Sequence, residues 1–104
     1  MLTVYGTDLC PDCRACKTNF DAYGIEYNYL SINEKLRYLK DFLILRDSEP
    51  VFDHLKAIHD IGIPAIVLED GKVITDWEGY VESLGHKVLP EGGTNACCTD
   101  HKGC

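Results

Sequence analysis

The alternation of hydrophobic and polar residues predicts a strand, a helix and a second strand at the start of the chain. LTVYG, residues 2–6, is apolar and β-branched and ends in glycine, as short strands often do. PDCRACKTNFDAYG follows, with Pro11 suited to the first helical turn and Gly24 suited to the C-cap. IEYNYLSI, residues 25–32, is apolar and aromatic enough for a second strand. This order favours two parallel strands joined by a right-handed crossover.

Helical spacing then dominates residues 33–60. The apolar residues that recur there every three or four positions are Leu36, Leu39 and Leu43. Ser31 and Glu34 stand before them with the spacing of a capping box. A second apolar stripe follows Pro50. The segment is therefore expected to form a pair of helices or one bent helix.

The last third of the chain predicts a hairpin, a short helix and a tail. AIVLEDGKVIT, residues 65–75, consists of two β-rich runs around Asp-Gly, a pair that supplies tight turns. DWEGYVESLG, residues 76–85, has the spacing of a short helix. From Pro90 onward, PEGGTNACCTDHKGC has no periodicity. We therefore expect one folded domain over residues 1–89 and an irregular, cysteine-rich tail over residues 90–104.

The composition is that of an acidic globular domain. Hydrophobic residues make up 45% of the 104 residues, which allows a core without disulfides. The formal charge at pH 7 is −7 and no run of Lys or Arg occurs, which argues against nucleic acid or a membrane surface as a partner. The N-terminus lacks the features of a signal peptide, and no apolar run reaches the length of a membrane span. We therefore expect a soluble, cytoplasmic monomer with basic or neutral partners.

The chain contains six cysteines. Structural disulfides are rare in a reducing cytosol, so another role is expected for them. Clustered cysteines there indicate catalysis or metal binding. Three lie in TDLCPDCRAC, residues 7–16, and three lie in the tail. The first group is open to three interpretations, which are an exchanging dithiol, a metal site or buried thiols.

Cys10 and Cys13 have the spacing of a redox pair at the start of a helix. Unpaired N–H groups and the positive end of the helix dipole stabilise a thiolate at Cys10, which makes it the expected nucleophile. Cys13 follows about one turn later, where it can attack a mixed disulfide at Cys10 and release the product. Asp8 and Asp12 oppose that thiolate, whereas basic side chains on the helix favour it. The alternative is a pair of small core residues.

Cys16 lies a further turn along the same helix. The commonest fate of such a residue is a buried, inert thiol. A ferredoxin-like iron–sulfur run would continue with cysteine and proline where Phe20 and Asp21 stand, so that kind of cluster is not supported.

The tail presents soft ligands that could surround Zn²⁺ or Cu⁺. These candidate metal ligands are Cys97, Cys98, His101 and Cys104. Their spacing matches no common zinc finger. A redox shuttle or disulfide tail and a solvated tail without function are the other interpretations.

Together these motifs resemble the glutaredoxin branch of the thioredoxin superfamily, of the dithiol C-P-x-C type. VYGTDLCPDCRACK is similar to that family's first strand, active site and first helix, and GIPAIVLEDGKVI to its cis-proline segment and hairpin. The resemblance spans roughly residues 1–85. It implies an α/β, thioredoxin-like fold, in which helices flank a four-stranded mixed sheet. The chain departs from the minimal family members in being longer between Cys13 and Pro64, so we expect an extended helical segment, within residues 33–60, between the second strand and the cis-proline strand.

The resemblance implies a redox-active centre for cell redox homeostasis and electron transport, with Cys10 as nucleophile and Cys13 as resolving thiol. Pro64 matches the family's cis-proline that faces the dithiol, and an ordinary trans proline at a strand start is the alternative. A cis bond would expose the backbone N–H and C=O of Ile63. The extended backbone of a substrate or of glutathione could pair with them like an added strand.

The chain departs from the family in the implied substrate site, which includes Pro11. Asp12 replaces the usual aromatic residue between the cysteines. The Gly-Gly-x-Asp-Asp that holds glutathione after the hairpin is absent, and Asp76 could substitute for it. DWEGY is instead similar to the Trp-Ser-Gly-Phe of glutaredoxin-like hydrogen donors to ribonucleotide reductase, which thioredoxin reductase reduces. Trp77 either covers the substrate groove or, as is more common for large aromatics, anchors the last helix in the core.

Two functions follow from these observations. The first is a thiol–disulfide oxidoreductase that reduces protein or glutathione mixed disulfides, without a tightly bound cofactor. Its electron donor would be glutathione or thioredoxin reductase. The second is a metal-binding or metal-delivery module that uses cysteines of the active site or of the tail. By analogy with the family, Pro11 disfavours a bridging iron–sulfur cluster of the monothiol type.

Overall fold

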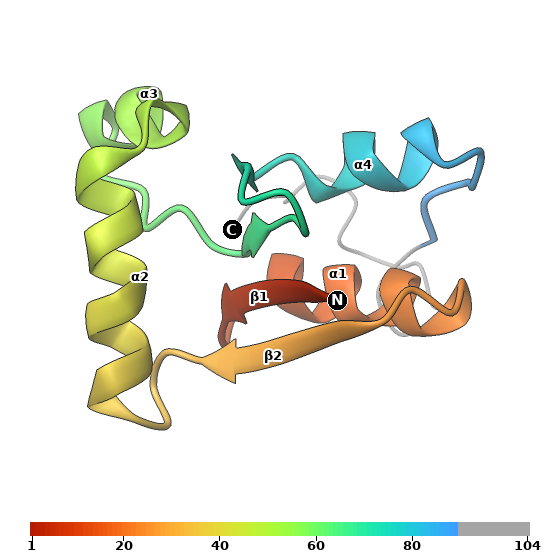
Figure 1. The fold of residues 1–104 in the computed structure, drawn as a ribbon, viewed down its shortest axis with the longest axis horizontal. Helices are drawn as coiled ribbons and strands as arrows, with labels where there is room; N and C mark the ends of the chain where they lie inside the picture. The colour runs from red at the N-terminus through yellow and green to blue at the C-terminus, as the bar shows by residue number, and fades with distance from the viewer. Residues whose placement is uncertain (90–104) are drawn as a thin grey trace.

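A four-stranded mixed sheet forms the centre of the protein. The computed structural model describes residues 1–89, and Figure 1 shows its fold. The strands are β1 (Leu2–Gly6), β2 (Tyr27–Ser31), β3 (Ala65–Val67) and β4 (Val73–Ile74). Their order is β2-β1-β3-β4, with β1 parallel to β2 and antiparallel to β3, and β3 antiparallel to β4. The predicted opening strand, helix and strand and the predicted hairpin over residues 65–75 are confirmed.

Helices cover and connect these strands. Those in the described part of the chain are α1 (Pro11–Ala22), α2 (Leu36–Ser48), the short 3-10 helix η1 (Pro50–Phe52), α3 (Asp53–Ala57) and α4 (Trp77–Ser83). In Figure 1, α2 lies beside the ends of the strands and runs across their direction. The extended helical segment predicted between β2 and β3 is therefore present. Within residues 1–89, no helix is both long enough and apolar enough to cross a membrane.

The two faces of the sheet bury different helices, because side chains alternate along each strand. One core cluster consists of Leu2, Val4, Cys16, Phe20, Ile66, Trp77 and Val81. The other consists of Phe42, Phe52, Ala65 and Val73, with Tyr5 packed against it. Thus α1 and α4 cover one face, and side chains of α2 and η1 pack against the other face near the ends of the strands (Figure 1). The predicted α/β architecture, a sheet flanked by helices, is confirmed.

Local signals set both ends of α1, the helix that carries the cysteines. Pro11 occupies its first turn, and Cys10 is the N-cap residue, with an extended backbone. At the other end Gly24 has a φ of 69°, and the N–H of Ile25 donates to the carbonyl oxygen of Phe20 at 2.9 Å. This closure requires a residue that tolerates the left-handed region, which glycine does without strain.

The capping box predicted at Ser31 and Glu34 is wrong. Ser31 ends β2, and its hydroxyl donates to Asn33 Oδ1 at 2.6 Å, while the N–H of Glu34 donates to the Ser31 carbonyl at 3.1 Å. The helix α2 begins only at Leu36, with Lys35 as its N-cap residue and no side-chain cap. A turn therefore uses the polar groups that the motif would have placed at a helix start.

Candidate active site

The loop between β1 and α1 presents Cys10. Thr7 orders this loop, since its Oγ1 accepts from the N–H of Leu9 at 3.2 Å and donates to Asn33 Oδ1 at 2.9 Å. The Thr7 carbonyl accepts from the Cys10 N–H at 3.1 Å, and the Cys10 carbonyl accepts from the Arg14 N–H at 3.1 Å. Cys10 is partly exposed, and Leu9 beside it is 78% exposed. A partner molecule can therefore approach the Cys10 sulfur.

Cys13 lies one turn further along α1 and is completely buried. Burial raises the pKa of its thiol to about 12; the Thr7 backbone lowers this pKa, and the charge of Cys10 and a hydrogen bond with Cys10 raise it. Cys13 is therefore protonated at neutral pH.

Gly6, at the end of β1, allows α1 to pack closely against the sheet. A Cβ atom at this position would lie 2.8 Å from Cys13 Sγ. The antiparallel register pairs Tyr5, the residue before Gly6, with Ala65, the residue after Pro64. Pro64 is fully buried, and the Ile63–Pro64 peptide bond is cis, as the resemblance implies. Cys13 thus lies against the last residue of β1, and Pro64 directly precedes the strand that pairs with β1.

The peptide before Pro64 retains unpaired backbone groups. Within residues 1–89, neither the N–H nor the C=O of Ile63 pairs with another backbone group. Ile63 lies at the point where the pairing of β3 with β1 stops, because β3 begins at Ala65. An extended peptide has donors and acceptors that match such a free edge.

Asp12 and Trp77 connect the active-site loop to α4. The indole Nε1–H of Trp77 donates to Asp12 Oδ1 at 3.4 Å. Trp77 is only 2% exposed and belongs to the core cluster beneath α1. The core role expected for Trp77 is therefore confirmed, and its polar edge also reaches the residue between the two cysteines. The negative charge of Asp12 is one of the lesser factors that raise the pKa of Cys13.

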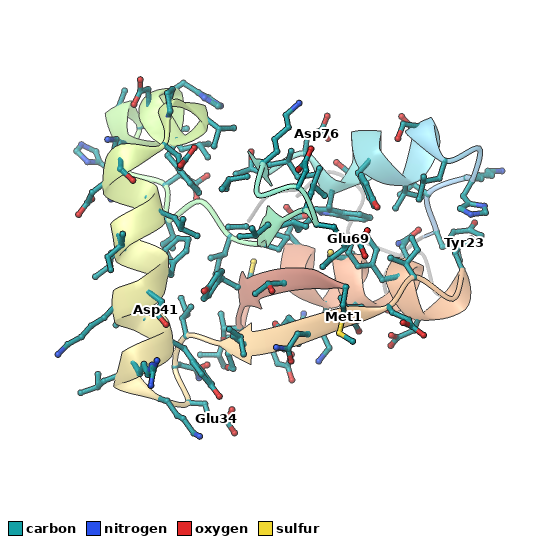
Figure 2. The ribbon with its side chains drawn as sticks, in the orientation of Figure 1. Met1, Tyr23, Glu34, Asp41, Glu69 and Asp76 are labelled. Atoms are coloured by element: carbon teal, nitrogen blue, oxygen red, sulfur yellow. The ribbon has the colours of Figure 1, made fainter. Side chains whose placement is uncertain are left out.

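Asp76 directly precedes α4, and Figure 2 labels it. Its Oδ1 accepts a hydrogen bond from the Gly79 N–H at 3.0 Å, so it is the N-cap of this helix. Asp76 is exposed. Its contribution to glutathione binding stays a prediction beside this structural role.

Cys16 is buried in the core, where only 1% of it is exposed. Burial raises the pKa of its thiol, and the charges of Cys13 and Asp12 add to this. Together these properties describe the inert thiol expected from the sequence.

Two neighbours of the dithiol, Gly6 and Tyr29, were not predicted from the sequence. Gly6 is glycine because Cys13 lies against it, and the hydroxyl oxygen of Tyr29 lies 3.1 Å from the same Cβ position. Within residues 1–89, this buried hydroxyl has no hydrogen-bond partner. The available signal was the parallel register, which pairs Tyr29 with Val4 and so sets both on the face that α1 covers.

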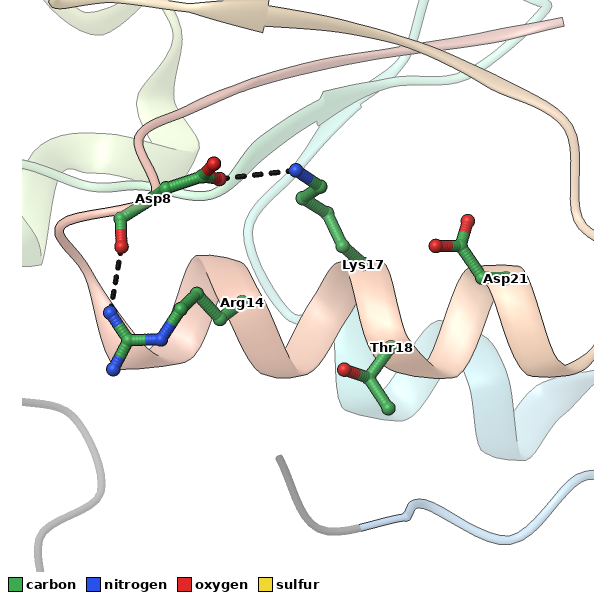
Figure 3. Close-up of a pocket in the computed structure, with 5 residues that line it drawn as sticks. All are labelled: Asp8, Arg14, Lys17, Thr18 and Asp21. Atoms are coloured by element: carbon green, nitrogen blue, oxygen red, sulfur yellow. Dashed lines mark hydrogen bonds and ion pairs between the residues drawn. The ribbon is translucent and has the colours of Figure 1, made fainter. Parts of the chain in front are cut away.

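A surface hollow of about 270 Å³ borders the site along α1 (Figure 3). Its lining residues are Asp8, Arg14, Lys17, Thr18 and Asp21. Lys17 Nζ lies 3.1 Å from Asp8 Oδ1, and Arg14 Nη1 donates to the Asp8 carbonyl oxygen at 2.7 Å. These contacts hold the Asp8 carboxylate above α1 at the edge of the hollow.

Among residues 1–89, no group of three or more His, Cys, Asp or Glu side chains is arranged to hold a metal ion. The metal ligands proposed in the tail lie outside the described residues. They are Cys97, Cys98, His101 and Cys104. The metal hypothesis for the tail therefore stays a prediction.

Comparison with known proteins adds a sequence relative and a structural neighbour. No family model matches the chain. An uncharacterized protein of Haemophilus influenzae is 37% identical over 73 residues, which cover 70% of this chain and 85% of that protein. The fold is similar to an epsilon-class glutathione S-transferase from the housefly, Musca domestica, with a TM-score of 0.51 and 27% sequence identity. That match covers 91% of this chain but only 37% of the transferase, and it identifies the fold as thioredoxin-like.

Proposed function

The chain belongs to the family of the uncharacterized Haemophilus influenzae protein, and we propose that it is a thiol–disulfide oxidoreductase that acts through Cys10 and Cys13. The observation that carries this proposal is the pairing of a partly exposed Cys10 at the start of α1 with a buried Cys13 one turn further on. One thiol is partly exposed and can attack a substrate, and the other is buried one turn behind it.

The reaction is a pair of thiol–disulfide exchanges. The Cys10 thiolate attacks a substrate disulfide, a bond forms between the two sulfurs, and one substrate thiolate leaves and takes up a proton. Cys13 then loses its proton and attacks the Cys10 sulfur, which releases the second substrate thiol and leaves a Cys10–Cys13 disulfide. The substrate disulfide has gained two electrons, and two thiols from a donor return the protein to its dithiol form.

Glutathione is the small-molecule thiol that we propose for this site. The structural neighbour with the same fold is a glutathione S-transferase, which supports glutathione as a ligand for this architecture. The free backbone groups of Ile63 suit the peptide-like backbone of glutathione, and Asp76, Pro11 and Asp12 would border it. For protein disulfides, the exposed Leu9 offers an apolar contact next to Cys10. Thioredoxin reductase is the other candidate donor.

A coupled assay tests the proposal. The full chain is supplied with a glutathione mixed disulfide or a protein disulfide, and NADPH oxidation is followed through glutathione and glutathione reductase or through thioredoxin reductase. We expect turnover with one donor, its loss in Cys10→Ser, and its retention in Cys16→Ala, which removes a buried thiol from the same helix. No turnover with either donor, or equal turnover without Cys10, would overturn the proposal.

A further inference from the structure

The hydroxyl of Tyr29 is a buried polar group placed against the resolving thiol. The Tyr29 oxygen lies 3.1 Å from the position that a Cβ atom on Gly6 would occupy, and Cys13 Sγ lies 2.8 Å from that same position. Both atoms therefore lie beside Gly6, at the end of β1. In the part of the chain that the structure describes, the Tyr29 hydroxyl oxygen has no hydrogen-bond partner.

The other side of Tyr29 faces charged groups at the surface. Lys17 Nζ lies 4.2 Å from the centre of the Tyr29 ring and 3.1 Å from Asp8 Oδ1. Lys17 thus holds the Asp8 carboxylate close to Tyr29, and the Asp8 side chain is 68% exposed at the hollow in Figure 3. Cys16 on α1 is near enough to raise the pKa of the Tyr29 hydroxyl slightly. On β2 the ring of Tyr27 contacts that of Tyr29, with ring centres 6.4 Å apart.

Tyr29 keeps its proton in this environment. Burial raises the pKa of its hydroxyl, and the nearby Cys13 and Asp8 raise it further. The hydroxyl can therefore donate a proton on one side while it accepts one on the other.

The proposed reaction requires removal of the proton from Cys13. Cys13 is completely buried, so its proton has no direct route to solvent when the sulfur attacks. We propose that Tyr29 is a proton-relay residue that links the Cys13 thiol to the Asp8 carboxylate during resolution of the mixed disulfide. This inference rests on the proposed oxidoreductase function.

The relay balances within the exchange step. As Cys13 Sγ bonds to Cys10 Sγ, the Cys13 proton passes to the Tyr29 oxygen. The original Tyr29 proton passes to Asp8, which releases it to solvent at the hollow. The bond between Cys10 and the substrate sulfur breaks, and the substrate thiolate takes up a proton from solvent. The relay itself consumes no oxidant or reductant.

A chromogenic disulfide separates the two exchange steps. The reduced full chain, with the three tail cysteines replaced by serine, is mixed with 5,5′-dithiobis(2-nitrobenzoate) in a stopped-flow instrument. Attack by Cys10 releases one thionitrobenzoate anion, and attack by Cys13 on the resulting mixed disulfide releases a second. Cys13→Ser identifies the second phase, because that variant should lose it.

Tyr29→Phe should leave the first phase unchanged and slow the second by about 100-fold at pH 7, the scale of a lost acid–base group. The slowed phase should also rise more steeply with pH than in the parent, since hydroxide then removes the proton. Asp8→Asn should slow the second phase as well. Tyr27→Phe, which removes a hydroxyl from the same strand, should change neither phase.

Two results would overturn the relay. One is a second phase in Tyr29→Phe within about twofold of the parent rate, far below the effect of a lost acid–base group. The other is equal slowing of both phases, which would show a structural role for Tyr29. Failure of the oxidoreductase proposal would look different, because the parent protein itself would then release no second anion that depends on Cys13.

Discussion

Replacement of Gly6 by alanine tests how closely α1 packs on β1. The added methyl carbon would lie 2.8 Å from Cys13 Sγ and 3.1 Å from the Tyr29 hydroxyl oxygen. Non-bonded heavy atoms prefer about 3.5–4.0 Å, so both neighbours must move. Cys13 is completely buried and has little room to do so.

The expected cost follows from this crowding. Overpacking of a core costs about 1–3 kcal/mol. Alanine returns about 0.4–1 kcal/mol by restricting the unfolded chain. Gly6→Ala should therefore lower the free energy of unfolding by about 1–2 kcal/mol, and turnover should fall because the resolving thiol is displaced.

Urea unfolding measures this loss directly, because Trp77 is the sole tryptophan of the chain and is buried. The fluorescence midpoint should fall by about 0.5–1 M urea. The same substitution in a Cys13→Ala background should cost much less, since the closest contact is then gone. An unchanged midpoint, or an equal loss in both backgrounds, would refute the close approach of Cys13 to Gly6.

Two further perturbations probe the same face of the sheet. Folding raises the pKa of Cys13 from its ordinary 9.0 to about 12. The free energy of unfolding should therefore fall as the pH rises from 9 towards 12. This fall should be smaller in Cys13→Ala, and an equal fall in that variant would show that Cys13 does not cause it. Asn19→Ala should lower the free energy of unfolding by about 1–3 kcal/mol, because the Asn19 side chain makes hydrogen bonds of 2.7 and 3.0 Å with the backbone of Leu89. An unchanged melting temperature would show that these two hydrogen bonds do not stabilise the fold.

Elements with strong signals at their ends were predictable from the sequence. Gly24 closes α1, Asp70-Gly71 lies in the β3–β4 turn, and Pro50 begins η1. The helix α2 was harder, because apolar residues lie on more than one of its sides. Leu36 is 73% exposed, whereas Phe42 is buried. Periodicity cannot choose between two apolar faces, since the sheet against which the helix packs decides.

Some residues of the candidate site were predictable from the sequence, and others depend on tertiary packing. The Cys10 and Cys13 pair follows from spacing within one helix, and Pro64 was located through the family resemblance. The hydrogen bond between Trp77 and Asp12 joins residues 65 positions apart, so it depends on the packing of α4 against α1. The position of Tyr29 near Cys13 also depends on tertiary packing, because it requires the register of two strands and the position of a helix.

Trapping of the first intermediate tests the central claim most directly. The full-length Cys13→Ser variant and the parent protein are incubated with glutathione disulfide, and their intact masses and peptide maps are recorded. We predict that the variant retains one glutathione on Cys10, whereas the parent releases it and contains a Cys10–Cys13 disulfide. Absence of glutathione from Cys10 in the variant, or a parent that keeps glutathione on Cys10 without forming that disulfide, would contradict a Cys10 and Cys13 exchange mechanism.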